Sequence, residues 1–191
     1  METIGLGGSC HWCTEAIFRS LKGVREVEQG WLSAQGLDGM SEGILVRFDP
    51  AGIDLYTLIQ IHLHTHSCTS NHSLRHRYRS AVYAFSPEQQ RASQICLKAL
   101  QSEFEHPVLT EALRFDAFEP SRQALQDYFY RNPQRPFCQV RISPKLSFLL
   151  KQFGAYVDGN KRQVIEQSVV DSDADSAVSP DTSSATESAN L

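Results

Sequence analysis

The chain has 191 residues, of which 41% are hydrophobic, and its 18 basic and 22 acidic residues give a formal net charge of −4. Six of the acidic residues and none of the basic ones lie in 163–191, so the rest of the chain is close to neutral and lacks the basic footprint of a nucleic-acid-binding protein. We expect no membrane segment, because no apolar run approaches the roughly 20 residues that span a bilayer.

The cysteine content predicts a reducing compartment. Five cysteines are an odd and sparse set for a secreted disulfide scaffold, and the first residues show no signal-peptide pattern. We therefore expect a cytoplasmic protein in which some thiols serve chemistry. The five are Cys10, Cys13, Cys68, Cys96 and Cys138.

Composition divides the chain into a domain and a tail. Residues 1–160 are long enough to form one domain with its own core. From about Ser168 the sequence has no aromatic, Lys or Arg residue and is rich in Ser, Asp and Ala. Such a segment cannot bury enough apolar surface to order itself, so we predict a disordered, acidic, Ser-rich tail over 161–191.

The hydrophobic pattern of the first half predicts alternating strands and helices. A Gly-rich strand leads to a helix that ends at a Lys-Gly pair. An alternating strand, a loop, another strand and a helix with Asp54 as candidate N-cap follow. These six elements are expected at 2–7, 12–21, 24–31, 32–41, 43–48 and 54–64.

The second half begins with a polar loop and continues with the same alternation. Ser86-Pro87-Glu88 is a strong helix start. The expected elements are a loop at 65–77, a strand at 79–85, a helix from 86 to about 105, a strand within 108–118, and helices at 123–130 and 142–153. Interleaved strands and helices predict an α/β or α+β fold.

Cys10 lies in the turn between the first strand and the first helix, after Gly7-Gly8-Ser9. The N–H groups at a helix start are unpaired and carry partial positive charge. They stabilise a thiolate and lower the pKa of a cysteine. Cys10 is therefore a candidate nucleophile.

Cys10 and Cys13 form a C-x-x-C pair with three possible interpretations. The pair can be a redox-active dithiol. It can be half of a zinc site, completed by His62, His64, His66 and Cys68, although His64 points away from the helix face that His62 and His66 share. The third interpretation is a nucleophile with a partner thiol nearby.

Three further positions are candidates on weaker grounds. Glu42 precedes a strand and can act as an acid, although most glutamates in such places are solvated. Glu15 lies in the first turn of a helix, where a capping or dipole role is expected. Basic residues surround Tyr78 and are interpreted mainly as a solvated loop; they are His72, Arg75, His76, Arg77 and Arg79.

Several segments, taken together and in order over about residues 3–153, resemble the A-type peptide methionine sulfoxide reductases. GGSCHWCTEAIF, from residue 7, is similar to the family's G-C-F-W-C/G-x-E motif. SEGILV, from residue 41, resembles H-x-E-x-V, and RYRSAVY, from residue 77, resembles Q-Y-R-S-A-I-Y. Two weaker matches add to these. One is Leu21-Lys22-Gly23-Val24 followed by Gly30-Trp31, and the other is NP followed by FCQ near residues 132–139.

This resemblance implies an α+β fold of the α/β sandwich type, with a central mixed sheet flanked by helices and the catalytic Cys10 at the start of the first helix. It implies peptide-methionine (S)-S-oxide reductase activity on protein-bound or free methionine sulfoxide. Cys10 would attack the sulfoxide sulfur, Glu42 would protonate the oxygen, and Tyr78 would hydrogen-bond it. Trp12, with His11 beside it, would form the wall for the S-methyl group.

The resemblance also implies how the enzyme is recycled. Cys10 would become a sulfenic acid, and a resolving thiol would form a disulfide that thioredoxin reduces. Neither a prosthetic cofactor nor a metal would be needed. The resolving candidates are Cys13, Cys68 and Cys138, whereas Cys96 lies mid-helix and is interpreted as structural.

The chain departs from the family pattern at three places. His11 replaces a Phe, the loop 32–41 is shorter, and residues 122–126 lack the charged and His residues of the family's E-x-Y-H-Q segment. Two other functions therefore stay open. One is a general thiol–disulfide oxidoreductase that uses Cys10 and Cys13, and the other is a redox-sensing or sulfoxide-binding protein without turnover.

Overall fold

The computed structural model describes residues 1–176 and contains one mixed sheet. Its strands lie in the order β1-β3-β2-β5-β4, and β4 pairs back with β1, so that the sheet closes into a barrel. β4 and β5 are parallel, and the other pairs are antiparallel. The strands are β1 (Glu2–Gly7), β2 (Val24–Ala34), β3 (Ser41–Phe48), β4 (Ala81–Ala84) and β5 (Glu111–Pro120). The mixed sheet with flanking helices confirms the predicted fold class.

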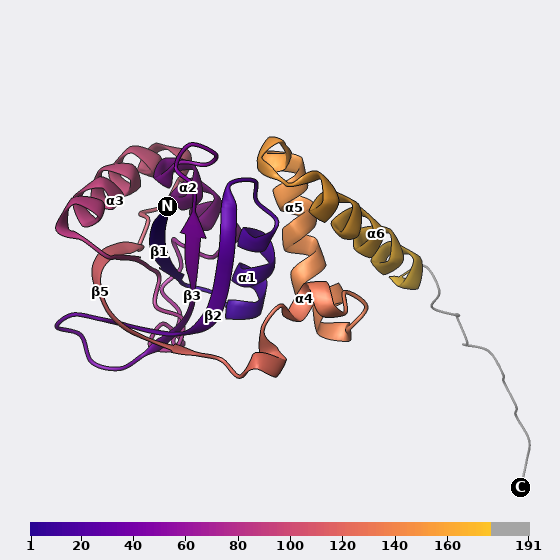
Figure 1. Cartoon of the computed structure of the whole chain (residues 1–191), viewed down its shortest axis with the longest axis horizontal. Coiled ribbons are helices and arrows are strands. Elements are labelled where there is room, and N and C mark those ends of the chain that lie inside the picture. The colour runs from indigo at the N-terminus through magenta and orange to yellow at the C-terminus, as the bar shows by residue number, and fades with distance from the viewer. Residues whose placement is uncertain (177–191) are drawn as a thin grey trace, which may run out of the picture.

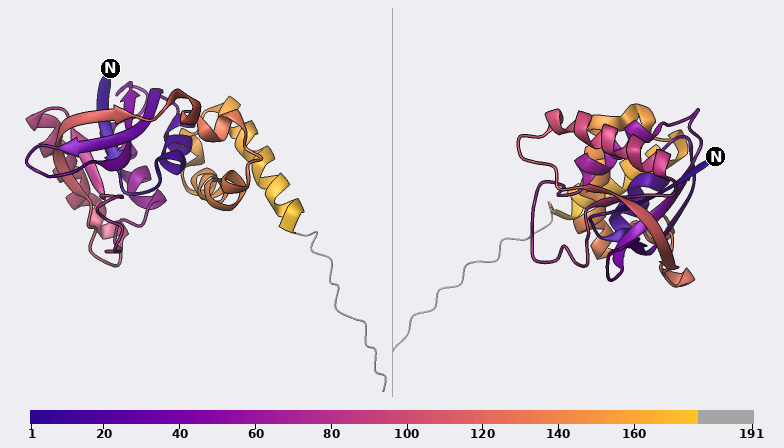
Figure 2. Two further views of the ribbon diagram at one scale, coloured as in Figure 1. Left: turned by 90° about the horizontal axis from the view of Figure 1, so that it is seen from below. Right: turned by 90° about the vertical axis from the view of Figure 1, so that its left-hand side faces the viewer.

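Helices flank this sheet on two sides, and in residues 1–176 α6 lies beyond α5 and away from the strands (Figure 1). α1 packs on β2 and β3 and also contacts α4 and α5. α4, α5 and α6 gather on one side of the molecule, whereas α3 covers the opposite side (Figure 2). The helices are α1 (His11–Arg19), α2 (Leu55–Thr65), α3 (Pro87–Leu100), α4 (Tyr128–Arg131), α5 (Ser143–Phe153) and α6 (Gly159–Ser176). Within residues 1–176, none of them has the length and apolar character needed to cross a membrane.

Side-chain caps begin two of the helices where the sequence predicts them. The Asp54 carboxylate accepts a hydrogen bond from the Thr57 N–H at 2.7 Å at the start of α2. Ser86 accepts one from the Gln89 N–H at 3.1 Å at the start of α3, with Pro87 as its first residue. Each cap satisfies a backbone donor that the helix itself leaves unpaired.

Three expected boundaries are wrong. The segment expected to be a loop from residue 32 continues β2 to Ala34, because Leu32 and Ala34 pair with β5. The helix expected at 123–130 is a short 3₁₀ turn at Gln123–Leu125 followed by α4, and Asp127 between them has a left-handed backbone (φ 56°). α3 ends at Leu100 and not near residue 105.

The predicted disordered tail is also wrong in its first half. Residues 161–176 belong to α6, in which Ile165 and Ser168 are buried against the helices before it. The contacts of Ile165 and Ser168 with the preceding helices, above all with α5, account for the order at the start of this stretch. The remaining residues, 177–191, lie outside the described part of the chain.

Two histidines are buried beneath the turn that follows β1. The His62 Nε2–H donates to the Gly7 carbonyl at 2.9 Å, and the His66 Nε2 lies 2.8 Å from the Ser80 hydroxyl. Their rings stack with centroids 4.1 Å apart. Burial lowers the pKa of His66 to about 4 and lowers the pKa of His62 as well. Both side chains are therefore neutral in the folded protein at neutral pH.

We expect the free energy of unfolding to fall as the pH drops from about 6.5 to 4. The unfolded chain takes up protons at these histidines near pH 6.5, but the folded chain does so only at lower pH, so the unfolded state gains stability. His66 alone should remove about 2 kcal/mol between pH 7 and pH 5, measured by urea denaturation. His66→Gln should flatten this dependence, whereas the exposed His106→Gln should not. Equal stability at the two pH values would contradict the prediction.

Candidate active site

Cys10 is the N-cap residue of α1, directly after the β1 turn. Its carbonyl accepts the first helical bonds from the N–H groups of Cys13 and Thr14, at 3.1 and 3.2 Å. Gly8 has φ +139°, and a Cβ there would lie 2.6 Å from the His66 ring. Only glycine therefore allows the chain to turn here, which places the half-buried Cys10 thiol at the helix start.

The surroundings of Cys10 favour its thiolate. A hydrogen bond from the Cys13 thiol is the largest cause that lowers the pKa of Cys10, to about 7, and the N–H groups of Trp12 and Cys13 add to it. Burial and the nearby Glu42 charge oppose this shift. A large fraction of Cys10 is therefore ionised at neutral pH, as a sulfur nucleophile requires.

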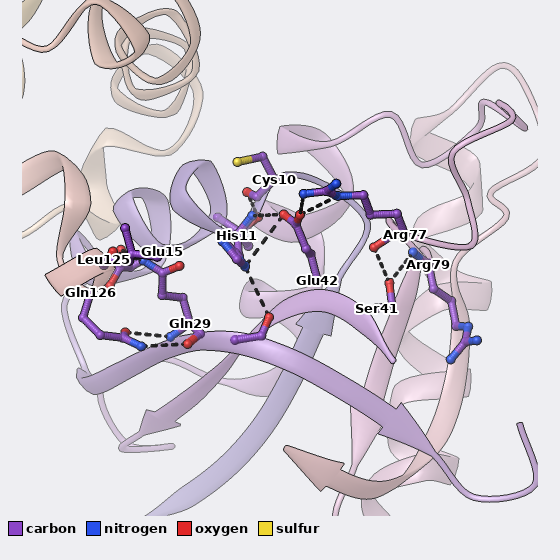
Figure 3. Close-up of polar contacts among 12 residues, drawn as sticks. Cys10, His11, Glu15, Gln29, Ser41, Glu42, Arg77, Arg79, Leu125 and Gln126 are labelled. Carbon is purple, nitrogen blue, oxygen red and sulfur yellow. Dashed lines mark hydrogen bonds and ion pairs between the residues drawn. The ribbon is translucent and has the colours of Figure 1, made fainter. Parts of the chain in front are cut away.

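Glu42 lies beside Cys10 at the start of β3 and is only 2% exposed. Its Oε2 accepts a hydrogen bond from the His11 backbone N–H at 3.3 Å. Its Oε1 lies 2.7 Å from the Arg77 Nε and 2.6 Å from the Arg77 Nη2 (Figure 3). Contacts on both oxygens fix the carboxylate in one orientation next to the thiol.

Aromatic side chains form the apolar part of the site. The Trp12 ring stacks on Tyr128 with centroids 4.1 Å apart, and Phe137 meets the same ring edge-on at 5.4 Å. His11 lies 5.9 Å from Trp12, and its Nδ1–H donates to the Gly30 carbonyl at 3.3 Å. Burial lowers the pKa of His11, so this wall is polar but not charged at neutral pH.

One cavity of about 610 Å³ brings these groups together. The predicted nucleophile, acid, oxygen-binding Tyr and methyl-pocket residues all line it: Cys10, Glu42, Tyr78, His11 and Trp12. Trp31 and Phe137 close its apolar side. The cavity therefore combines a thiolate, a buried carboxylate and a phenol hydroxyl with an apolar wall.

The three candidates for the resolving thiol lie at different distances from this site. Cys13 is buried three residues along α1 and hydrogen-bonds the Cys10 sulfur. Cys68 and Cys138 are buried in the core and line neither cavity that Cys10 lines. The pKa of all three thiols is raised, most strongly for Cys13, through its contact with Cys10 and through burial, and through burial for Cys68 and Cys138. Position beside Cys10, and not thiol acidity, therefore distinguishes Cys13 from the other two.

The interpretation of the basic residues around Tyr78 as a solvated loop is wrong for two of them. Arg77 pairs with Glu42, and its guanidinium also lies 5.7 Å from the Trp31 ring centroid. The Arg75 Nη1 donates to the carbonyls of Tyr78 at 3.1 Å and of Gly8 at 3.4 Å. Arg75 therefore ties the loop that carries Tyr78 to the turn that carries Cys10.

Glu15 does not cap α1, contrary to the expectation. Its buried carboxylate accepts hydrogen bonds from the backbone N–H of Asp127 at 2.6 Å and of Tyr128 at 3.2 Å, and from the Gln29 side chain at 3.1 Å. Burial raises its pKa. Glu15 thus fastens the segment before α4 to α1, which places Tyr128 on the Trp12 ring.

The zinc interpretation receives no support from side-chain geometry. His62 and His66 share a helix face, as expected, but three of their four ring nitrogens are already bonded. The His62 Nε2 bonds to the Gly7 carbonyl, and the His66 Nδ1 and Nε2 bond to the His62 carbonyl and the Ser80 hydroxyl. In the described part of the chain, no three His, Cys, Asp or Glu side chains are arranged to hold a metal ion.

A half-exposed thiolate at a helix start, a buried carboxylate and an adjacent second thiol in an aromatic cavity define a thiol-dependent oxidoreductase. Comparison with known proteins agrees. The family model for peptide methionine sulfoxide reductase matches residues 2–156. A protein of Trichodesmium erythraeum called peptide methionine sulfoxide reductase MsrA is 34% identical over 80% of this chain and 96% of its own. The chain belongs to the peptide methionine sulfoxide reductase family.

Solved structures show the same fold. Mxr1 from Saccharomyces cerevisiae in its reduced form superposes with a TM-score of 0.61 at 18% identity, covering 70% of this chain and 86% of that one. The structure of Mxr1 in complex with Trx2 has a TM-score of 0.54 at 18% identity, with 63% and 81% coverage. At this identity, the superposition supports the fold and leaves the residue roles to the geometry above.

Proposed function

We propose that this chain reduces the S epimer of methionine sulfoxide to methionine, with Cys10 as the nucleophile. The observation that carries the proposal is the shared cavity, in which the Cys10 thiolate faces the same space as Glu42 and Trp12. The Cys10 sulfur attacks the sulfoxide sulfur to form an S–S bond, and the protonated oxygen leaves as water when the S–O bond breaks. Water then attacks the Cys10 sulfur, the S–S bond breaks, methionine leaves, and Cys10 becomes a sulfenic acid.

The oxygen needs protons while the S–O bond breaks. Glu42, once its carboxylate has taken up a proton from water, is the group placed to supply one. Its carboxyl is held on both sides, by His11 and Arg77, so it stays next to Cys10. Tyr78 lines the same cavity and can donate its hydroxyl hydrogen to the oxygen. Buried, oriented donors stabilise developing charge without having to reorganise.

The apolar wall sets which part of the substrate enters. The stacked Trp12 and Tyr128 rings, with Phe137 across one edge, leave a flat apolar surface beside Cys10. Contact between the apolar S-methyl group of the substrate and this surface removes both from water, which is favourable. His11 makes part of the wall polar. With its Nδ1–H bonded to Gly30, its Nε2 can accept a hydrogen bond, which suits a sulfoxide whose neighbouring groups donate one.

Cys13 is the resolving thiol in this proposal. It follows Cys10 by three residues on α1, lines the second space that Cys10 lines, and lowers the pKa of Cys10 more than any other group does. The Cys13 thiol attacks the sulfenic sulfur of Cys10, and the oxygen leaves as water. Thioredoxin then reduces the Cys10–Cys13 disulfide, a step supported by the fold shared with the Trx2-bound yeast protein. A cytoplasmic location, where that reductant stays reduced, is part of the same proposal.

The test is turnover with separate epimers. The purified protein is incubated with dithiothreitol and either the S or the R epimer of N-acetylmethionine sulfoxide, and the sulfide is quantified. We expect methionine from the S epimer alone, in many turnovers. Reduction of insulin disulfides without sulfoxide reduction would instead establish a general thiol–disulfide oxidoreductase. A single equivalent of sulfide, with none thereafter, would indicate a sensor.

Replacing Cys13 by Ser should separate the two half-reactions. The first equivalent of methionine should still form, because Cys10 and Glu42 remain. Turnover with thioredoxin should drop at least about tenfold, because the sulfenic acid lacks its resolving thiol. Peptide mapping after one turnover should find a Cys10–Cys13 disulfide in the wild type, and Cys138→Ser should leave it in place. A Cys10–Cys138 or Cys10–Cys68 disulfide would overturn the assignment.

A further inference from the structure

Cys10 also lines a second hollow, which adjoins the sulfoxide cavity and shares Tyr78 and Phe137 with it. This hollow has a volume of about 520 Å³, within the range of roughly 300–1,000 Å³ that is typical of small-molecule pockets. It is bounded by the Gly8–Ser9 turn, by the loop that carries Leu74 and by the segment that carries Arg141. Cys13 lies at its base next to Cys10. The thiol pair is therefore reached from a space that the sulfoxide does not need.

The two spaces differ in charge. Glu42 and Glu119 balance Arg77 and Arg122 around the sulfoxide cavity. The second hollow contains Arg141 and Lys145 and has no Asp or Glu among its lining residues. Anions are therefore attracted to the second hollow and not to the first.

The cations of the second hollow are close enough to the thiols to act on them. The pKa of Cys13 is raised overall, by its hydrogen bond with Cys10 and by burial. The Lys145 charge acts in the opposite direction and lowers this pKa. The Arg141 backbone carbonyl lies 4.0 Å from the Cys13 sulfur, and its side chain is exposed and has no acidic partner within residues 1–176. The Arg141 guanidinium and the Lys145 ammonium, which also donates to the Thr65 carbonyl, thus give the lining beside the two thiols a positive charge.

We propose that this hollow binds a small thiol that carries a carboxylate, and that this thiol reduces Cys10 there. The inference rests on the proposed oxidation of Cys10. The neutral sulfoxide enters through the balanced cavity, and the anionic thiol enters through the basic one. The small thiol is then a second source of electrons for the enzyme, besides a protein dithiol such as thioredoxin.

The chemistry balances in two thiol–disulfide exchanges. The small thiolate attacks the Cys10 sulfur of the Cys10–Cys13 disulfide, and Cys13 leaves as a thiolate beside Lys145 and takes up a proton. A second small thiol attacks the sulfur of its own kind in the mixed disulfide on Cys10. Cys10 is released as a thiol, and the two small thiols leave as their disulfide. Two electrons have then passed from two thiols to the protein.

The experiment compares thiols of different charge as reductants of the oxidised protein. Thioglycolate is anionic, 2-mercaptoethanol is neutral and cysteamine is cationic near neutral pH. The protein is oxidised with diamide, so the test does not depend on sulfoxide turnover, and thiol release is followed by titration. Each rate is divided by that of the same thiol with hydroxyethyl disulfide, a neutral reference. We expect thioglycolate to exceed cysteamine by about tenfold or more at low salt, and high salt should reduce the ratio.

Arg141→Glu tests the location. This change should lower the thioglycolate-to-cysteamine ratio about tenfold, because it reverses a charge at the rim. Arg141→Gln should have a smaller effect in the same direction. Arg131→Glu is the matched control, because Arg131 is also exposed but lines neither space, and its ratio should stay near that of the wild type. Equal normalised rates for the three thiols, or equal effects of Arg141→Glu and Arg131→Glu, would overturn the proposal.

Discussion

Replacing Cys10 by Ser is expected to abolish methionine formation, with a loss of at least about a thousandfold in kcat/KM. A serine hydroxyl stays protonated at neutral pH, whereas Cys10 has its pKa held near 7 by Cys13 and by the helix N–H groups. The sulfur is also the atom that accepts the oxygen, so the hydroxyl offers no substitute for the product state. The measurement is sulfide formed from the S epimer with dithiothreitol.

The fold should survive this change, since Cys10 is only half-buried and Ser is a good helix N-cap. Thermal melting within a few degrees of the wild type would show that the loss is chemical. Cys96→Ser is the control for removal of a thiol far from the cavity, and it should keep full turnover. Residual turnover in Cys10→Ser above a few per cent would mean that another thiol is the nucleophile.

Glu42→Gln is expected to reduce sulfoxide reduction by about 10²–10⁴-fold, the range for loss of a general acid. The amide keeps the shape of the side chain, but it has no proton to give. Its oxygen can still accept from Arg77, whereas its NH2 group then faces the His11 N–H and cannot accept from it. Arg77 is 52% exposed and can be solvated, so we expect the free energy of unfolding to fall by only about 1–3 kcal/mol, the cost of one buried unpaired donor.

The same substitution should affect alkylation of Cys10 in the opposite direction. The Glu42 charge raises the pKa of Cys10, so its removal lowers that pKa and increases the thiolate fraction below pH 7. Iodoacetamide should then react with Cys10 as fast as in the wild type or faster near pH 6, while sulfoxide reduction falls. If both rates fell together, Glu42 would be acting on the nucleophile and not on the substrate oxygen.

Local sequence was sufficient to predict the position of Cys10. The Gly-rich turn between a strand and a helix is encoded within ten residues, and the structure places the thiol at the helix start as predicted. The capped starts of α2 and α3 are local in the same sense, because Asp54 and Ser86 bond to residues three positions ahead.

Local sequence did not predict the contacts of Glu42, Arg75 and Arg77. The contacts of Glu42 come from His11, 31 residues away, and from Arg77, 35 residues away, so nothing near it in the sequence distinguishes it from a solvated carboxylate. Arg75 lies in a polar loop, where exposure is the usual outcome, yet it bonds to a carbonyl 67 residues away. Contacts with residues distant in the sequence determine whether such a side chain is buried and bonded or exposed. Only the resemblance to a family indicated roles for Glu42 and Tyr78.

The stack of Trp12 on Tyr128 has a consequence for how the enzyme can be observed. The chain has only two tryptophans, Trp12 and Trp31, and both line the cavity that holds Cys10. The entire indole emission of the protein therefore originates at the place where sulfur chemistry occurs. Intrinsic fluorescence should change when the cavity fills and again when Cys10 is oxidised, which would allow each half-reaction to be followed in a stopped-flow instrument without a label.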